Sequence, residues 1–373
     1  MKIAYVYDAV YPWETGGVQK RVWELARRLA SDHDVHWYGL HYWEGPRSIE
    51  REGITLHGVG ASGDLYVDGR RSIPEALRFS AQLLRPLLRE NFDLIDFQEF
   101  PYFPAFPSKL HSLSRQSALV VTWHEIWDSY WYDYLGWKGI FGQTIERITA
   151  ALPDAHIAVS ERTSEDVQTL SGHTPSLVPN GISFEEIQAA PDADREIDVL
   201  FVGRLIPEKN PVTVVEATDR LRRKYPDIQT VLVGDGPKRD AVAAAIDRLD
   251  LEANVTLRSP LDEYSEVIAL MKAASVFVLP SHREGFGMTV LEALACGTPV
   301  VTVQHPQNAA QELVTDGVTG IVCNPSVSAI ARAARTAQSL SQSACVDAAE
   351  KYEWTTLVDR LEAVYQSVLT RQA

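Results

Sequence analysis

Short β-rich runs alternate with longer helical patterns from the first residue to about residue 325. This alternation is typical of βαβ units, whose strands form parallel sheets. A first series has candidate helices at 18–29 and 74–89 and candidate strands at 3–7, 35–40, 54–59, 94–97, 119–122 and 156–159. A second series has candidate strands at 199–202, 230–233, 255–257, 276–279 and 300–303. The pattern predicts an α/β protein with two Rossmann-like domains.

A break rich in turn-forming residues separates the two series between residues 174 and 194. Prolines and an Asn-Gly pair at such a place are the composition expected of a domain junction. A chain of 373 residues is also too long for one ordinary core. We predict domains over 1–178 and 179–353 with a cleft between them, followed by an amphipathic helix over 354–373.

The charge balance excludes one class of partner. With 35 basic and 50 acidic side chains, the net charge of -15 argues against nucleic-acid binding. Cys296, Cys323 and Cys345 have no paired spacing, so neither disulfides nor a zinc site is expected. No run approaches the roughly 20 apolar residues of a membrane span. We expect a cytoplasmic protein that touches a membrane, if at all, at its inner surface.

The segment 279–303 carries the densest chemistry, because a strand, a glycine turn and a helix follow one another directly. The amides of Gly285, Phe286 and Gly287 are expected to face a phosphate at the helix N-terminus. Glu284 is expected to accept hydrogen bonds from sugar hydroxyls, and Glu292 from a ribose. The alternative is a capping carboxylate followed by a solvated helix residue. The two glycines favour the binding interpretation.

Two cations follow the strand at 199–202, where loops face the ligand crevice of an open α/β sheet. Arg204 and Lys209 can neutralise a diphosphate, the first through its planar fork and the second as a point charge. The alternative is a solvated loop with a salt bridge to Glu208. In a chain of net charge -15, this placement favours an anion site.

The first domain offers a glycine pair and a histidine. Gly16 and Gly17 end the loop after the first strand, but they do not form GxGxxG, so a nicotinamide fingerprint is absent there. His124 directly follows the strand at 119–122 and is expected to hold a donor sugar or its phosphate, either neutral or as a cation.

Aromatic residues concentrate between residues 123 and 141. Three interpretations stay open: carbohydrate stacking by side chains such as Trp127 and Trp131, burial at a membrane interface, or packing on the sheet. Arginines on or next to the helix at 74–89 are expected on a solvated face or at lipid headgroups; they are Arg70, Arg71, Arg78, Arg85 and Arg89. Asp192 and Asp194 have no strand end to orient them, so no metal is expected.

Six elements in order resemble glycosyltransferase family 4 over nearly the whole chain. They are the glycine pair at 16–17, His124 after its strand, PNGI at 179–182, VGRLIPEKNP at 202–211, VGDGP at 233–237 and EGFGMTVLEALACGTPVV at 284–301. The resemblance implies a GT-B fold in which two parallel-sheet domains face a central cleft and a C-terminal helix crosses back to the first. It implies metal-independent, retaining transfer of a hexose-type sugar from a nucleotide diphosphate sugar, with no cofactor, to a glycan, lipid-linked or small-molecule acceptor.

The resemblance also implies residue roles. Arg204, Lys209 and the 285–287 amides would contact the diphosphate, Glu284 the sugar and Glu292 the ribose, while His124 and Gly17 would face the reacting centre. The acceptor would meet the first domain near Gly16, Gly17, Trp127 and Trp131. Arg258 stands near the expected base pocket, where Arg258, Ser259 and Pro260 replace an expected glycine, and residues 304–308 replace an expected glycine pair. The nucleotide therefore stays open between UDP, GDP and ADP.

Two other functions are compatible with these motifs. One is a non-hydrolysing sugar-nucleotide 2-epimerase, which needs no acceptor site. The other is a non-catalytic protein that binds a sugar nucleotide and acts through a partner.

Overall fold

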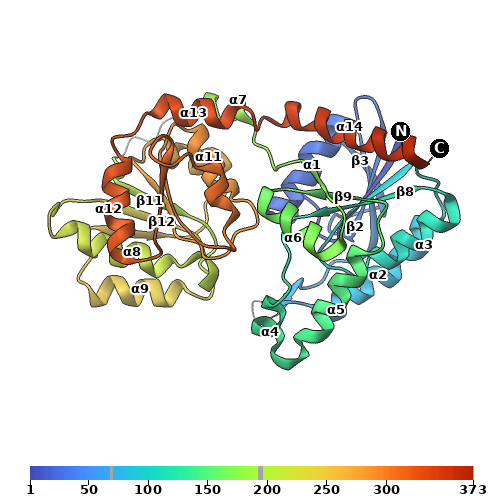
Figure 1. The fold of residues 1–373 in the computed structure, drawn as a ribbon, viewed down its shortest axis with the longest axis horizontal. Helices are drawn as coiled ribbons and strands as arrows, with labels where there is room; N and C mark the ends of the chain where they lie inside the picture. Colours follow the sequence, from blue (N-terminus) through green and yellow to red (C-terminus); the bar gives the residue numbers. More distant parts are fainter. Residues whose placement is uncertain (68–69, 192–195, 373) are drawn as a thin grey trace. The chain divides into compact units, whose positions relative to one another are not determined.

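A computed structural model describes residues 1–67, 70–191 and 196–372 (Figure 1). The chain divides into two α/β units. Unit 1 comprises Met1–Asn180 with Trp354–Ala373, and unit 2 comprises Gly181–Glu353. The aspartates at 192 and 194, considered above for a metal, lie outside the described residues.

Unit 1 is built on an eight-stranded sheet of order β10-β9-β8-β7-β1-β2-β4-β3. All of its pairings are parallel except that of β3 with β4. The strands are β1 (Lys2–Val6), β2 (Asp34–His41), β3 (Ser48–Arg51), β4 (Ile54–Ala61), β7 (Leu94–Gln98), β8 (Ala118–Trp123), β9 (Ala155–Ala158) and β10 (Ser176–Leu177). A separate two-stranded sheet pairs β5 (Tyr66–Val67) with β6 (Arg70–Arg71).

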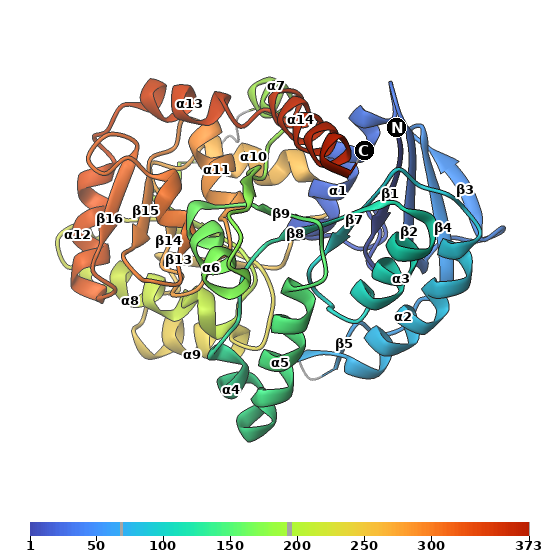
Figure 2. The same cartoon turned by 45° about the vertical axis from the view of Figure 1, so that its right-hand side comes forward.

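Helices cover both faces of this sheet. Figure 2 shows α2 and α3 packed side by side on one face, with α1 and α14 on the other. The helices of unit 1 are α1 (Gly17–Leu29), α2 (Ile73–Leu88), α3 (Ala105–Arg115), α4 (Tyr130–Leu135), η1 (Gly136–Lys138), α5 (Gly139–Ala150), α6 (Glu161–Ser171) and α14 (Trp354–Gln372).

The terminal helix α14 belongs to the first unit although the whole second unit precedes it. It contacts α1 and β8, and its fully buried side chains recur every three or four positions, at Trp354, Leu357, Leu361 and Tyr365. This spacing places them on one helical face. The predicted crossing back of the C-terminal helix to the first domain is confirmed.

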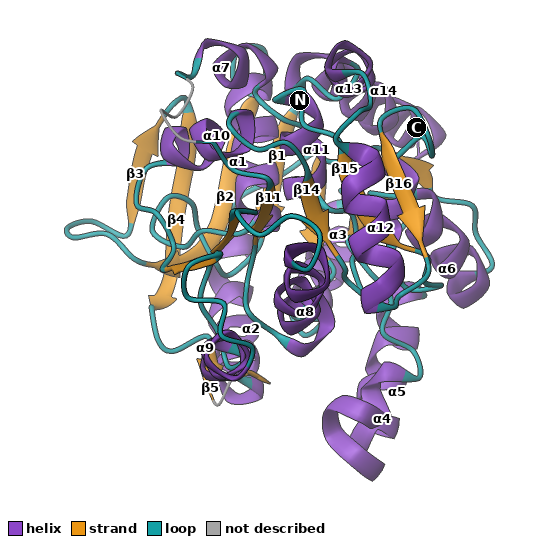
Figure 3. Cartoon of the chain, turned by 90° about the vertical axis from the view of Figure 1, so that its left-hand side faces the viewer, coloured by secondary structure: helices purple, strands orange, loops and turns teal. Residues whose placement is uncertain are grey.

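Unit 2 has a six-stranded, all-parallel sheet of order β13-β12-β11-β14-β15-β16 (Figure 3). Its strands are β11 (Val199–Val202), β12 (Thr230–Val233), β13 (Val255–Arg258), β14 (Phe277–Leu279), β15 (Val300–Val303) and β16 (Gly320–Cys323). Its helices are α7 (Phe184–Ala189), η2 (Pro207–Lys209), α8 (Pro211–Arg222), α9 (Arg239–Arg248), α10 (Tyr264–Lys272), α11 (Met288–Ala295), η3 (Ala309–Leu313), α12 (Val327–Ala337) and α13 (Gln342–Glu350). The predicted architecture of two parallel-sheet α/β domains is confirmed.

Strand order reverses once in each sheet, between β1 and β7 in unit 1 and between β11 and β14 in unit 2. In open α/β sheets, ligands bind beyond the carboxyl ends of the strands at such a switch point. The loops that follow these four strands are therefore the first places to look for function.

Candidate active site

The switch point of unit 2 brings together two motifs that lie far apart in the sequence. Lys209, in the loop after β11, donates a hydrogen bond to Glu284, in the loop after β14, with 2.7 Å between Nζ and Oε2. The two side chains are only 16% and 17% exposed. The backbone N–H of His282 donates to the carbonyl of Glu208 at 2.8 Å, which joins the same two loops. The pair is an ion pair at the ligand-facing edge of the sheet.

Local backbone geometry shapes the cationic loop. Lys209 ends η2, and Pro211 opens α8 two residues later. A Cβ at Gly203 would lie 3.2 Å from Cδ of Lys209, so the glycine leaves room for the lysine stem. Arg204 lies in the same loop with an exposed side chain. The structure therefore brings Lys209, but not Arg204, into contact with Glu284.

The glycine turn precedes helix α11, which begins at Met288. Gly287 has a φ of 101°, a conformation that L side chains rarely adopt, and a Cβ there would lie 2.6 Å from Cβ of Ala310. Glu284 is held on both sides by backbone bonds, from its N–H to Gln307 and from Ala309 to its carbonyl. Only glycine suits position 287.

The segment 304–308 stands where the resemblance leads us to expect a glycine pair, and Asn308 organises its end. This fully buried side chain donates to Thr302 and to the carbonyl of Val303, at 3.0 and 2.8 Å, and accepts from the N–H of Ala310. Asn308 therefore anchors the loop beside Glu284 through its side chain.

Glu292 is buried within α11 and accepts a hydrogen bond from the hydroxyl of Tyr264 at 2.9 Å. Burial and the neighbouring Glu292 carboxylate raise the pKa of Tyr264, so its hydroxyl stays a donor. The alternative of a solvated helix residue at position 292 is wrong. Arg258 ends β13, half-buried, at the same edge of the sheet.

In unit 1, His124 follows β8 directly and contacts the end of β7. Its Nε2 lies 2.9 Å from Oε1 of Gln98, whose amide nitrogen donates to Asp96 at 3.0 Å. With the Gln98 amide in this orientation, His124 carries its proton on Nε2, and Nδ1 is an acceptor. Burial, together with the charge of Arg21, lowers the pKa of His124 to about 3. At this pKa the neutral form of His124 is the one present at neutral pH, and its role in holding a donor remains a prediction.

The hydrogen bonds behind His124 continue through the sheet to the terminal helix. Asp96 accepts from the hydroxyls of Thr122, at 2.9 Å, and of Tyr365 on α14, at 2.5 Å. Burial raises the pKa of Asp96 to about 6 against these stabilising bonds. This network was not predicted from the sequence. The acid and the amide inside the buried strand 94–98 are the signal that could have indicated it.

The glycine pair opens α1 as expected, with Gly16 as its N-cap and Gly17 as its first residue, and both are exposed. One turn later, the buried guanidinium of Arg21 donates to the carbonyl of Pro179, at 2.6 Å, and to Oδ1 of Asn180, at 3.0 Å. Arg21 thus ties α1 to the PNGI motif, a contact that the sequence did not indicate.

The aromatic segment divides into packed and exposed parts. Trp131 is 5% exposed, and Trp127 stacks on Phe100 with ring centroids 5.1 Å apart. Buried Glu146 accepts from the backbone N–H of Trp127 at 2.8 Å. Packing therefore accounts for Trp131, and its acceptor-side role remains a prediction. By contrast, Trp137 is 75% exposed.

Arg71 does not lie where the sequence predicts. Arg71 lies in β6 before the helix and forms a buried ion pair with Asp8 through both carboxylate oxygens. Burial raises the pKa of Asp8, and the guanidinium opposes that rise. Arg71 is therefore on neither a solvated helix face nor a lipid-facing surface, whereas Arg78, Arg85 and Arg89 are exposed.

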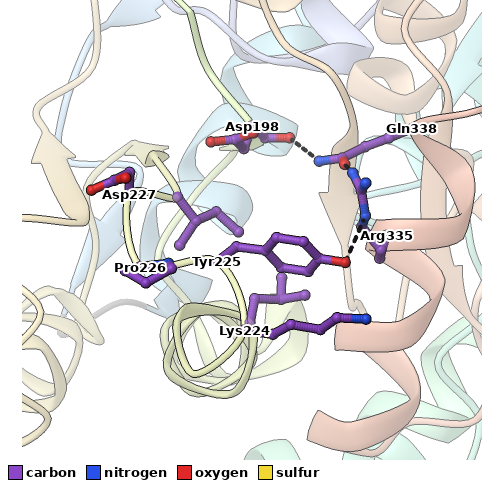
Figure 4. A pocket seen from close by; sticks show the side chains of 9 residues that line it. Asp198, Lys224, Tyr225, Pro226, Asp227, Arg335 and Gln338 are labelled. Carbon is purple, nitrogen blue, oxygen red and sulfur yellow. Dashed lines mark hydrogen bonds between the residues drawn. The ribbon is translucent and has the colours of Figure 1, made fainter.

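A pocket of about 370 Å³ lies elsewhere in unit 2 (Figure 4). Its lining includes Asp198, which precedes β11, and Ile228, which precedes β12, so it opens at the amino ends of the strands. Figure 4 shows Arg335 bonded to the hydroxyl of Tyr225, at 3.1 Å between Nε and the oxygen. The pocket is distinct from the Lys209–Glu284 site at the carboxyl ends.

Among the described residues, no three or more His, Cys, Asp or Glu side chains gather in a way that could hold a metal ion. No helix in the described ranges is long and apolar enough to cross a bilayer.

Comparison with known proteins adds two family matches that together cover most of the chain. Residues 15–186 match the family described as Glycosyltransferase Family 4, and residues 183–352 match Glycosyl transferases group 1. A glycogen synthase of Mycobacterium tuberculosis is 30% identical over 249 residues, which are 62% of this chain and 59% of that protein. The chain therefore spans less than two thirds of that relative's length.

Two further proteins match almost the whole chain. One subunit of the phosphatidylinositol N-acetylglucosaminyltransferase of Homo sapiens is 26% identical over 391 residues, covering 98% of this chain and 76% of that protein. The solved structure of HepE from Anabaena, in complex with UDP, superposes with a TM-score of 0.76 at 18% identity and covers 98% of this chain and 100% of that chain. At this identity the superposition shows a shared fold.

Proposed function

We propose, from the premise that this chain is a glycosyltransferase of the family 4 type with a GT-B fold, that it moves a hexose-type sugar from a nucleoside diphosphate sugar to an acceptor with retention of configuration. The observation that carries the proposal is the half-buried Lys209–Glu284 pair at the switch point of unit 2. A cation and a carboxylate held side by side match a ligand that is anionic at one end and rich in hydroxyls at the other.

Unit 2 supplies the donor contacts in this proposal. Lys209 and Arg204 offset the negative charge that develops on the leaving diphosphate, and the backbone N–H groups of 285–287 stabilise the same charge. Glu284 turns from Lys209 toward the sugar hydroxyls when donor binds, and Glu292 and Arg258 lie toward the nucleoside. The UDP in the HepE structure makes UDP the first nucleotide to test.

In unit 1, His124 is the residue that we propose for contact with a sugar hydroxyl. A neutral imidazole whose Nδ1 is an acceptor suits a sugar hydroxyl, but a pKa of about 3 makes His124 too weak a base to take the acceptor's proton at neutral pH. The proton is therefore assigned to the leaving group. The acceptor oxygen bonds to the anomeric carbon as the bond to phosphate breaks, and its proton passes to the departing phosphate oxygen.

The acceptor is proposed to be lipid-linked. The name of the human relative includes phosphatidylinositol, and that match extends over 98% of this chain. A lipid-linked acceptor would place the enzyme at the cytoplasmic face of a membrane, as a peripheral protein. Transfer to a glycan or to a small soluble molecule is the other outcome that an acceptor screen can give.

The decisive experiment pairs donor binding with turnover. UDP and its sugars should raise the melting temperature, because a ligand that binds only the native state stabilises it. Lys209→Ala and Glu284→Ala should each lower transfer about a hundredfold, the usual cost of losing a charge-stabilising contact. The matched control is Arg248→Ala, whose 3.7 Å ion pair with Glu216 lies on an exposed face of unit 2.

Three results would replace the proposal. Undiminished transfer in both site variants would remove the assigned site. Conversion of a labelled sugar nucleotide to its epimer, with no acceptor present, would identify a 2-epimerase. Selective nucleotide binding with no turnover on any acceptor would identify a non-catalytic binding protein.

A further inference from the structure

The α4–α5 hairpin of unit 1 presents a cluster of large apolar side chains at its tip. Trp137, Ile140 and Phe141 are 75%, 51% and 67% exposed, within five consecutive positions. Figures 2 and 3 show α4 and the start of α5 extending away from the strands of unit 1. These three residues are called the tip below.

The tip cannot relieve its exposure by folding inward, because the inner side of the hairpin is filled. Trp131 occupies it so closely that a Cβ at Gly142 would lie 2.2 Å from its ring. A Cβ at Gly139 would lie 2.5 Å from the carbonyl oxygen of Trp131. Both glycines are buried, so α4 and α5 meet at contact distance and the tip residues are held outward.

The segment that carries the tip has a positive charge, whereas the protein as a whole is acidic. Residues 134–142 contain Lys138 and no acidic residue, in a chain whose net charge is -15. The Lys138 ammonium lies 5.9 Å from the ring centroid of Trp137. An exposed tryptophan beside a lysine, followed by two large apolar residues, suits the headgroup region of a bilayer, where phosphates lie above acyl chains.

Size argues against a protein partner. A stable protein interface buries about 800 Å² on each side and engages roughly 20 residues. Three apolar side chains at the end of a narrow hairpin offer much less than this. The same few side chains are enough for reversible insertion into a bilayer, whose binding strength scales with the apolar area that enters it.

We propose that Trp137, Ile140 and Phe141 insert into the headgroup region of a lipid bilayer, with Lys138 at the level of the phosphates. The inference deepens the proposed function, because it gives a lipid-linked acceptor a route to unit 1. It differs from electrostatic attachment through the arginines of α2, since Arg71 is committed to Asp8 and apolar insertion depends little on salt.

Vesicle co-sedimentation of the full chain tests the inference. The parent protein should sediment with vesicles of phosphatidylcholine alone and with vesicles containing phosphatidylglycerol, and binding should change less than about twofold between low and high salt. The double variant Trp137→Ser/Phe141→Ser should lose about tenfold or more of its binding, as removal of two large apolar side chains implies. Leu113→Ser is the matched control, because Leu113 is 71% exposed on α3 of the same unit.

Three results would each overturn the inference. The parent could fail to sediment with both vesicles, the double variant could bind as the parent does, or binding could require anionic lipid at low salt. Gel filtration of the parent and the variant adds a fourth, a dimer that the substitutions dissociate, which would make a second copy the occupant. The shift in melting temperature with UDP, measured without vesicles, tests donor binding separately, so either idea can fail alone.

Discussion

Each of the two units is built on its own mainly parallel sheet with one switch point, but the two place their polar groups in different ways. Unit 2 puts an ion pair, Lys209 with Glu284, at the edge where a ligand can reach it. Unit 1 has a chain of buried, hydrogen-bonded groups there, from the neutral His124 through Gln98 to Asp96. The same kind of sheet can therefore serve charge stabilisation in unit 2 and rigid positioning of side chains in unit 1.

The largest expected effect concerns the stability of unit 1. Asp96→Leu leaves the donors of Thr122, Gln98 and Tyr365 buried without their acceptor, so unfolding of unit 1 should become easier by about 3 kcal/mol or more. Urea unfolding measures this. The control is Thr298→Val in unit 2, which removes one buried bond to the carbonyl of Met271 and should cost about 1 kcal/mol. Equal losses in the two variants would contradict a network in unit 1.

The next effect concerns catalysis in unit 2. If Lys209 and Glu284 act on one donor, the double variant Lys209→Ala/Glu284→Ala should lose little more than either single variant. The loss in kcat/KM should stay near a hundredfold, or about 2.7 kcal/mol, because residues that act as a unit are not additive. Steady-state kinetics of all four proteins measures the coupling. Fully multiplicative losses would show two independent contacts.

A third effect should separate the units by pH. Among the described residues, the histidines with a lowered pKa all lie in unit 1. Burial lowers the pKa of His124 to about 3 and the pKa values of His57 and His156 to about 4. The unfolded chain takes up these protons below about pH 6.5 while the native state does not, so stability is lost as pH falls. At pH 5 the lowered pKa of His124 alone reduces the free energy of unfolding by about 2 kcal/mol relative to neutral pH.

Asp96 has the opposite sign. Its native pKa of about 6 lies above the unfolded value of 3.8, so protonation in the native state returns about 1 kcal/mol at pH 5. The carboxyls of Asp8, Glu99 and Glu146 also have raised pKa values and act in the same direction as Asp96. Comparing variants isolates the histidine contribution: His156→Gln should lose less stability in urea between pH 7 and pH 5 than the parent does. An equal loss in the two proteins would show that the imidazole of His156 is not neutral and buried.

The smallest effect tests the inner end of the donor site. Tyr264→Phe removes a hydrogen bond worth about 1 kcal/mol from Glu292, the carboxylate proposed to bind ribose. We expect KM for the donor to change about fivefold, with kcat nearly constant. A fall in kcat alone would place Glu292 at the reacting centre.

Much of the fold follows from the sequence because buried parallel strands are short apolar runs. The predicted strands at 199–202, 230–233 and 300–303 agree with β11, β12 and β15, whose residues are all buried. The edge strand β3 was missed, since Ser48–Arg51 is mostly exposed and has no apolar pattern. β16 was missed because only its first residue, Gly320, is buried.

The candidate residues of the two units differ in how well the sequence predicts their contacts. In unit 2 the chemistry is local, so each strand, loop and helix start is one continuous motif, and the meeting of Lys209 with Glu284 was foreseeable from the sheet. In unit 1, Arg21, Asp96 and Tyr365 come from three distant segments. Contacts of this kind depend on tertiary packing, and no local pattern announces them.

The position of α14 has a consequence for synthesis of the protein on the ribosome. Tyr365 completes the hydrogen bonds of Asp96, a residue made some 270 positions earlier. The hydrogen bonds of Asp96, in the central sheet of unit 1, therefore stay incomplete while the whole of unit 2 is translated. Unit 2 is continuous in the sequence and can fold first, so a nascent chain halted before α14 should hold a finished second half and a protease-sensitive first half.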